Sequence, residues 1–104
     1  MGRVNRGEVW EHPLRSRQFV IVATRHLLDT GTVVLAEIAP EVPAGTRGML
    51  AVQLGEHDPV PGAVLSYRLN WLAADRMAEW KYLGRLSEGT LEAVNMSLRV
   101  ALDL

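Results

Sequence analysis

With 104 residues the chain has the length of one ordinary domain, so residues 1–104 are predicted to form a single domain, and 48% hydrophobic content argues against disorder. A net charge of −1 argues against nucleic-acid binding by bulk electrostatics alone, and the lack of cysteine excludes disulfides, thiol nucleophiles and cysteine-based zinc sites. No apolar run is long enough to cross a bilayer and the N-terminus does not resemble a signal peptide, so we expect a soluble, cytoplasmic protein without membrane contact.

Most of the chain is predicted to form short β-strands separated by turns. Pro13 cannot donate to a central ladder, so it marks the turn of a first hairpin, and Asp29-Thr30-Gly31 marks a second turn. The run from Phe19 to Ala23 is apolar without a break, which is typical of a strand covered on both faces. The predicted strands cover residues 7–12, 18–25, 32–38, 48–54, 62–67 and 80–86.

Two helices are predicted in the second half of the chain. Residues 68–76 fit one short helix with Leu69 and Leu72 on its inner face. Ser87 is a good N-cap for a longer closing helix, because its side chain can accept from a free backbone N–H of the first turn. The apolar stripe of that helix comprises Leu91, Val94, Leu98 and Ala101. Strands followed by a helix indicate a mainly β fold, a small antiparallel barrel packed by a C-terminal helix.

Two segments carry a family resemblance that covers most of the chain. The first is Arg6-Gly7-Glu8-Val9-Trp10, followed after a short loop by Arg17 and the apolar run from Phe19, and the second is Leu83-Gly84-Arg85-Leu86-Ser87. Both resemble segments of the MazF/PemK/CcdB family of toxins from bacterial toxin–antitoxin pairs. The resemblance implies an SH3-like small antiparallel β-barrel of the CcdB/PemK type, a homodimer, and a cognate antitoxin as partner.

The resemblance also implies a toxin that acts as an endoribonuclease on single-stranded RNA without a metal or other cofactor. In the family's nucleases the ribose 2′-hydroxyl attacks the adjacent phosphate, which requires a base, an acid and a cation beside the charged phosphorane. Arg17 matches the family's catalytic arginine, and its planar fork suits phosphate oxygens. His12 lies in the same loop and is the natural general acid or base, since histidine titrates near neutrality. The simpler interpretation of both residues is a solvated surface side chain.

Arg15, Arg25 and Ser66 are the predicted RNA-binding residues. Arg15 precedes Arg17 by two positions, so in an extended segment both side chains point to one face and can bind successive phosphates. Ser66 and Tyr67 stand where some PemK-like members carry an arginine and an aspartate. The arginines are also the surface that an extended acidic segment of an antitoxin is expected to cover. Plain hairpin surface charge is the alternative for Arg15.

Two further groups of residues allow a functional and a structural interpretation. Trp71, Trp80 and Tyr82 can stack on unpaired bases, or they can belong to the core or a dimer interface. Glu37 and Glu41 can form a paired-carboxylate site, although carboxylates near loops are usually only solvated.

Three departures from the family pattern keep other functions open. Ile38, with Glu37 beside it, stands where many family nucleases carry a threonine or serine, and the loop after Trp10 is short. The short hairpin is closer to the CcdB branch, which poisons DNA gyrase, but the chain lacks the C-terminal tryptophan on which that branch depends. The alternatives to a nuclease are therefore a gyrase poison without enzymatic activity and a degenerate, non-catalytic binding module of the same fold.

Overall fold

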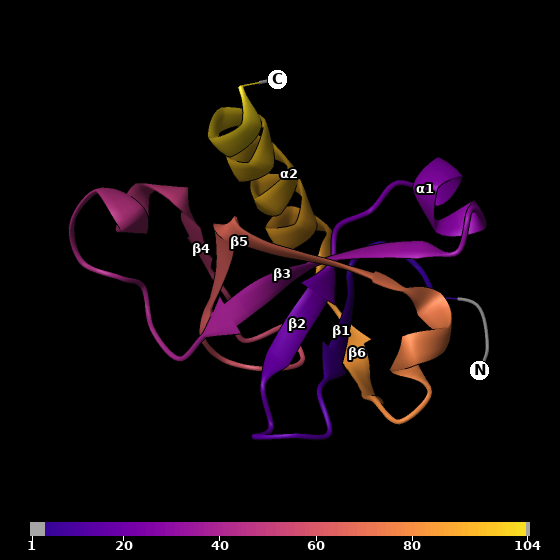
Figure 1. The fold of residues 1–104 in the computed structure, drawn as a ribbon. Coiled ribbons are helices and arrows are strands. Elements are labelled where there is room, and N and C mark those ends of the chain that lie inside the picture. The colour runs from indigo at the N-terminus through magenta and orange to yellow at the C-terminus, as the bar shows by residue number, and fades with distance from the viewer. Residues whose placement is uncertain (1–3, 104) are drawn as a thin grey trace.

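The strand-forming segments assemble into a six-stranded antiparallel sheet with the strand order β4-β5-β3-β2-β1-β6 (Figure 1). The computed structural model describes residues 4–103. The strands are β1 (Glu8–Glu11), β2 (Gln18–Ile21), β3 (Thr32–Ala39), β4 (Ala51–Gln53), β5 (Ala63–Ala73) and β6 (Lys81–Arg85). The helices are α1 (Arg25–Asp29) and α2 (Glu88–Leu102), with the short 3-10 helices η1 (Gly45–Leu50) and η2 (Ala74–Met77). The sheet curls into a half-barrel, which confirms the predicted mainly β fold with a C-terminal helix.

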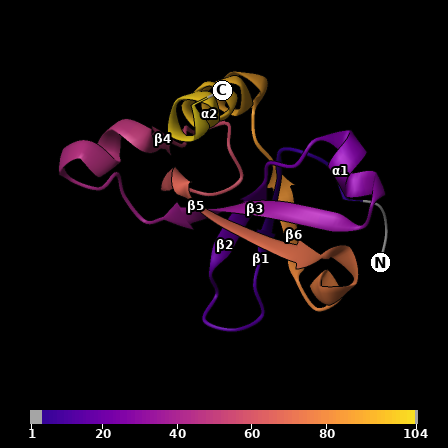
Figure 2. The ribbon, with the colours of Figure 1, turned by 45° about the horizontal axis from the view of Figure 1, so that its top comes forward.

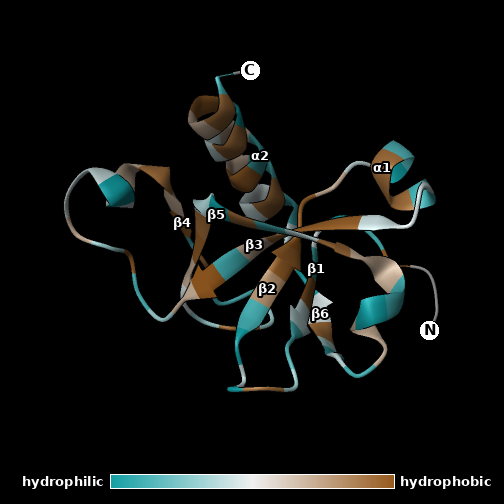
Figure 3. Cartoon of the chain, in the orientation of Figure 1, coloured by the Kyte–Doolittle hydropathy of each residue, from teal (hydrophilic) through white to brown (hydrophobic). Residues whose placement is uncertain are grey.

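The core lies where the two central strands are apolar on both faces. Every residue from Phe19 to Ala23 and from Val33 to Ala36 is buried. Helix α2 adds the buried Val94 and Leu98 from its predicted stripe and contacts β4, β5 and η1. Figure 3 shows the change along β2 from hydrophilic residues at the β1–β2 loop to hydrophobic residues at the end of the strand. Among residues 4–103, no helix is both long and apolar enough to cross a membrane.

Arg6, from the opening motif, joins the start of the sheet to the C-terminal helix. Its guanidinium donates to the carbonyl of Val22 and to the side-chain oxygen of Asn95 on α2. Partial burial lowers the pKa of Arg6 below its ordinary value, but these acceptors favour the charged form. Gly7 has φ +89°, and a Cβ there would lie 3.1 Å from Leu91, so glycine suits both the backbone and the close approach of α2. The arginine and glycine of the motif are therefore structural.

The N-terminus of α2 is held by its predicted cap and by a second polar group. Ser87 Oγ accepts from the backbone N–H of Thr90 at 3.4 Å, which confirms the N-cap. Asp58, in the β4–β5 loop, accepts from the Ser87 N–H and the Thr90 hydroxyl, both at 2.8 Å, and from the Gly55 N–H at 2.7 Å. Burial alone would raise the pKa of Asp58, but these hydrogen bonds outweigh it and lower the pKa below 3.8.

The structure corrects three element predictions. The helix predicted over 68–76 is wrong for residues 68–73, because β5 continues to Ala73 and pairs with β3 from Thr32 onward, and only residues 74–76 lie in the 3-10 helix η2. The strand predicted over 48–54 is shortened to β4, since η1 occupies its first part. Residues after β2 form the five-residue helix α1, where only a turn was expected.

Candidate active site

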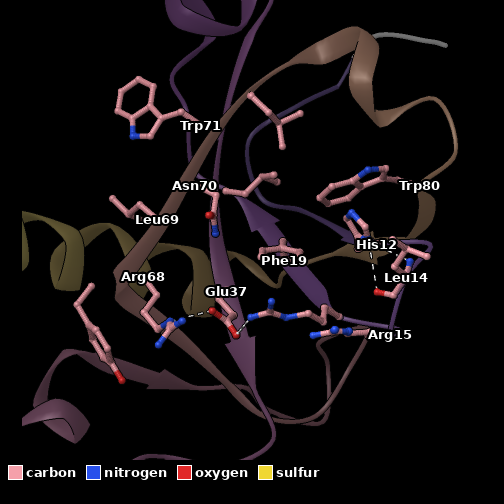
Figure 4. A pocket seen from close by; sticks show the side chains of 14 residues that line it. His12, Leu14, Arg15, Phe19, Glu37, Arg68, Leu69, Asn70, Trp71 and Trp80 are labelled. Carbon is pink, nitrogen blue, oxygen red and sulfur yellow. Dashed lines mark hydrogen bonds and ion pairs between the residues drawn. The ribbon is translucent and has the colours of Figure 1, made fainter.

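A cleft of about 740 Å³ lies between the β1–β2 loop and the second half of β5 (Figure 4). Its floor is formed by β2 and β3, and the β1–β2 loop lies at the end of the sheet opposite α2 (Figures 1 and 2). The lining residues are His12, Leu14, Arg15, Arg17, Phe19, Leu35, Glu37, Tyr67, Arg68, Leu69, Asn70, Trp71, Leu72 and Trp80. A second hollow of about 360 Å³ shares Arg15, Arg17 and Glu37 with the cleft and extends it toward the end of β3.

One carboxylate at the floor of the cleft holds two arginines. Arg17 Nη2 donates to Glu37 Oε1 at 2.5 Å. Arg68 Nε donates to Glu37 Oε2 at 2.9 Å (Figure 4). The Glu37 side chain is 17% exposed, whereas Arg17 and Arg68 are 47% and 56% exposed. Arg17 also lies over the ring of Phe19, with its guanidinium carbon 5.9 Å from the ring centroid. The arginines therefore extend from the cleft wall over a shielded carboxylate.

An irregularity in the pairing of β3 with β5 brings Arg68 to this position. The register steps from Ala36 opposite Leu69 to Glu37 opposite Leu65, so residues 66–68 of β5 have no partner on β3. Such a bulge bends a strand and redirects its side chains, and bulges are frequent beside active sites. Here it buries Ser66 and leaves Arg68 beside the Glu37 carboxylate.

The β1–β2 loop turns tightly and carries four of the cleft residues, His12, Leu14, Arg15 and Arg17. The backbone N–H of His12 donates to the carbonyl of Arg17 at 2.7 Å and closes the loop. At its tip, Arg15 and Ser16 have φ +64° and +50°, the pattern of a type I′ turn, which glycine or asparagine normally occupies. Arg15 is thus not in an extended segment, so the predicted alternation with Arg17 does not apply, although both residues line the cleft.

Aromatic side chains flank the charged floor. The His12 ring packs edge-on against Trp80 with 4.8 Å between centroids, and Trp80 also contacts Phe19 at 5.5 Å. Trp71 is 65% exposed at the rim, where Figure 4 shows it directed away from the other aromatic groups. Tyr82 packs instead on Trp10, with 5.3 Å between centroids, and does not line the cleft. Trp80 is therefore largely a packing residue, and Trp71 is free to stack.

The structure brings three of the five predicted site residues together and separates two. His12, Arg15 and Arg17 line the cleft. Arg25 lies on α1, where it forms an ion pair with Asp29, outside the cleft. Ser66 is 0% exposed, so the prediction of an RNA contact is corrected: the bulge turns this side chain into the interior. Among residues 4–103, no cluster of three or more histidine, aspartate or glutamate side chains could hold a metal ion.

Sequence reasoning missed two charged residues of the cleft. The sequence analysis gives Glu37 a role only in a pair with Glu41, which does not line the cleft, and otherwise notes it as the neighbour of Ile38. Arg68 falls in the predicted helix, although the alternation of apolar and polar residues from Tyr67 to Trp71 is a strand pattern in the sequence.

Comparison with known proteins finds matches in structure only: no protein-family model matches the sequence, and no curated protein does. An endoribonuclease from a mycobacterial species matches with a TM-score of 0.82 and 27% identity, over 100% of this chain and 95% of that one. An endoribonuclease in complex with its cognate antitoxin, also mycobacterial, matches with a TM-score of 0.81 and 26% identity, over 100% of this chain and 97% of that one. A chain of the MazE–MazF complex of Deinococcus radiodurans matches with a TM-score of 0.78 and 19% identity, over 100% of this chain and 99% of that one.

Fold and site together define a class, the antiparallel half-barrel with a C-terminal helix that MazF-type toxins share. Within this class the chain is similar in structure to proteins of the MazF family of toxins. The family is the one that the segments from Arg6 to Trp10 and from Leu83 to Ser87 resemble.

Proposed function

We propose that this chain is the toxin of a type II toxin–antitoxin pair and a metal-independent endoribonuclease that cuts single-stranded RNA in the cytoplasm. The observation that carries the proposal is that Arg17 and His12 line one cleft, beside a carboxylate and an exposed tryptophan. Support comes from the likeness to endoribonucleases at 27% and 26% identity over the whole chain. Because those structures are nucleases, the likeness favours RNA cleavage over gyrase poisoning.

The cleft holds groups for each part of the reaction. The ribose 2′-oxygen attacks the phosphorus, the bond to the 5′-oxygen breaks, and the products are a 2′,3′-cyclic phosphate and a 5′-hydroxyl. Arg17 stabilises the charge on the phosphorane through its paired N–H groups. Glu37, whose Oε1 lies 2.5 Å from Arg17 Nη2, is the carboxylate that lines the cleft, and it accepts the proton of the 2′-hydroxyl.

His12 serves as the acid, because it lines the cleft together with Arg17 and its ring is held at Nδ1 by the backbone of Leu14. The Leu14 N–H lies 2.9 Å from His12 Nδ1 and donates to the neutral ring. The Leu14 carbonyl lies 3.3 Å from the same nitrogen and accepts from it when the ring is protonated. The protonated ring then gives its Nε2 proton to the leaving 5′-oxygen, while its Nδ1–H stays on the ring and donates to the Leu14 carbonyl.

The test is cleavage of a long single-stranded RNA in excess chelator by matched arginine variants. Arg17→Ala is expected to lower the cleavage rate by about 10²-fold or more, as removal of one oxyanion donor does. Arg47→Ala, which removes an exposed arginine of η1 outside the cleft, is expected to keep the wild-type rate. Equal rates for the two variants would contradict the assigned role of Arg17.

The antitoxin is proposed to cover the same arginines with an extended acidic segment. Two of the matching structures are complexes of a toxin with its antitoxin. Arg15 and Arg17 line both hollows and are exposed, so an acidic segment lying there would contact both. Changing both residues to glutamate is expected to abolish antitoxin binding. Unchanged affinity, measured by calorimetry, would place the antitoxin on another surface.

A further inference from the structure

The Glu37 carboxylate is held between the side chains of two arginines, Arg17 and Arg68. Each carboxylate oxygen accepts from a different arginine, and these arginines lie 20 and 31 residues away in the sequence. Arg17 lies in the β1–β2 loop directly before β2, Glu37 lies on β3 and Arg68 lies in the bulge of β5, so one loop and two strands supply the three charged groups. The bulge is required for this arrangement, since it supplies the unpaired segment that carries Arg68.

The two ion pairs are suited to exchange with another anion. Both arginines are about half exposed, and exposed ion pairs contribute little to stability because water and salt screen them. Arginine binds phosphate oxygens with the same planar geometry that it uses for carboxylate oxygens. The guanidinium groups of Arg17 and Arg68 already point at one carboxylate, so a phosphodiester that replaces this carboxylate can accept hydrogen bonds from both.

We propose that Arg17 and Arg68 form a two-arginine clamp for one phosphodiester of the RNA, and that Glu37 occupies this clamp in the free protein as an internal competitor. Binding of RNA then requires that the phosphate displaces the Glu37 carboxylate from both arginines. The inference rests on the proposed function for the nature of its ligand. RNA is favoured over an acidic peptide because the exposed Trp71 lines the same cleft and offers a stacking surface for a base.

The first arm of the test measures binding of a 2′-O-methyl oligoribonucleotide, which lacks the attacking hydroxyl and stays intact. Glu37→Gln removes the charge and leaves an amide oxygen that cannot neutralise two arginines. Its affinity is expected to rise by roughly tenfold, the size of two exposed ion pairs taken together. Glu41→Gln removes an exposed carboxylate just after β3, outside the cleft, and is expected to bind as the wild type does.

The second arm concerns Arg68. Arg68→Ala is expected to weaken oligonucleotide binding by about tenfold and to reduce the slope of log affinity against log salt by roughly 0.7, the value for one phosphate contact on a single strand. Arg47→Ala is the matched control, and it is expected to leave that slope unchanged. In the Glu37→Gln background, Arg68→Ala is expected to remove the gain in affinity. Circular dichroism and urea unfolding confirm that each variant is folded.

The outcomes separate this inference from the proposed function. The inference is overturned if Glu37→Gln binds the oligonucleotide no more tightly than the wild type, if Arg68→Ala matches Arg47→Ala, or if neither wild type nor Glu37→Gln binds at all. It is also overturned if the Glu37→Gln gain appears only with an acidic antitoxin peptide. If both arms behave as expected but unmodified RNA is never cut, the clamp stands and the nuclease function fails.

Discussion

The backbone N–H of His12 donates to the carbonyl of Arg17 at 2.7 Å, so the two proposed catalytic residues close the same loop. Their relative position therefore depends on the turn between them. That turn places Arg15 and Ser16 in the left-handed region, where a side chain normally costs free energy. The strained turn and the hydrogen bond together hold His12 and Arg17 at a fixed relative position.

Relief of this strain is expected to stabilise the protein. Ser16 has φ +50°, and Ser16→Gly is expected to raise the free energy of unfolding by roughly 0.5 to 1 kcal/mol. Ser16→Ala keeps the Cβ and is expected to bring no gain. Urea unfolding of the three proteins measures the difference, and a destabilised Ser16→Gly variant would contradict the turn geometry.

Asp58 is expected to make stability depend on pH in the acid range. Its pKa in the folded protein lies below 3.8, so its contribution is complete above that pH and is lost as the pH falls through the folded pKa. Asp58→Asn is expected to cost roughly 1 to 2 kcal/mol at pH 7, because three donors lose a charged acceptor. Urea unfolding from pH 7 to pH 2 should show the gap to wild type narrowing below pH 3.8. The exposed Asp75→Asn is the control, and a gap that widens in acid contradicts this account.

Trp71 is expected to contribute to RNA binding and not to stability. Stacking of one base on an aromatic ring contributes about 1 to 3 kcal/mol, and most of the Trp71 side chain is exposed at the cleft. Trp71→Ala should weaken binding of an intact 2′-O-methyl oligonucleotide by that amount. Tyr82→Ala removes an exposed aromatic side chain outside the cleft and should not. Equal losses of binding affinity in the two variants would show that Trp71 has no specific role in RNA binding.

The protein is expected to be a dimer in solution. A small half-barrel buries a limited core, and the two contacting helices α2 and η1 leave Met96, Val100 and Met49 exposed. Light scattering at micromolar concentration should give twice the chain mass of 11.5 kDa. Val100→Glu places a charge on the exposed side of α2 and should shift the mass toward the monomer. A wild-type protein that is monomeric at all concentrations tested would contradict the expectation.

The sequence predicts this fold well where local signals and tertiary packing agree. Ser87 and the apolar stripe place α2 correctly, and unbroken apolar runs identify the central strands. The prediction fails at residues 68–73, because Leu69 and Leu72 have helical spacing while pairing with β3 holds the segment extended. Helix α1 is too short to produce a periodic signal.

The candidate site could be predicted only in part, because it depends on one irregular pairing. The loop residues His12, Arg15 and Arg17 are close in sequence, so their proximity follows from the hairpin. The ion pair of Glu37 with Arg68 depends on the bulge at residues 66–68, and no local sequence pattern predicts a bulge. The same bulge explains why Ser66, which is polar and was expected at the surface, is buried.

The most direct test of the nuclease account incubates the purified wild-type protein with a long single-stranded RNA in excess chelator and identifies the ends of any products. The account predicts cleavage, with 2′,3′-cyclic phosphate on one product end and 5′-hydroxyl on the other, because the 2′-oxygen is the attacking group. A parallel reaction with DNA gyrase should show no effect on supercoiling. Intact RNA together with stalled gyrase would contradict the nuclease and establish a gyrase poison, and intact RNA with active gyrase would leave a binding module without chemistry.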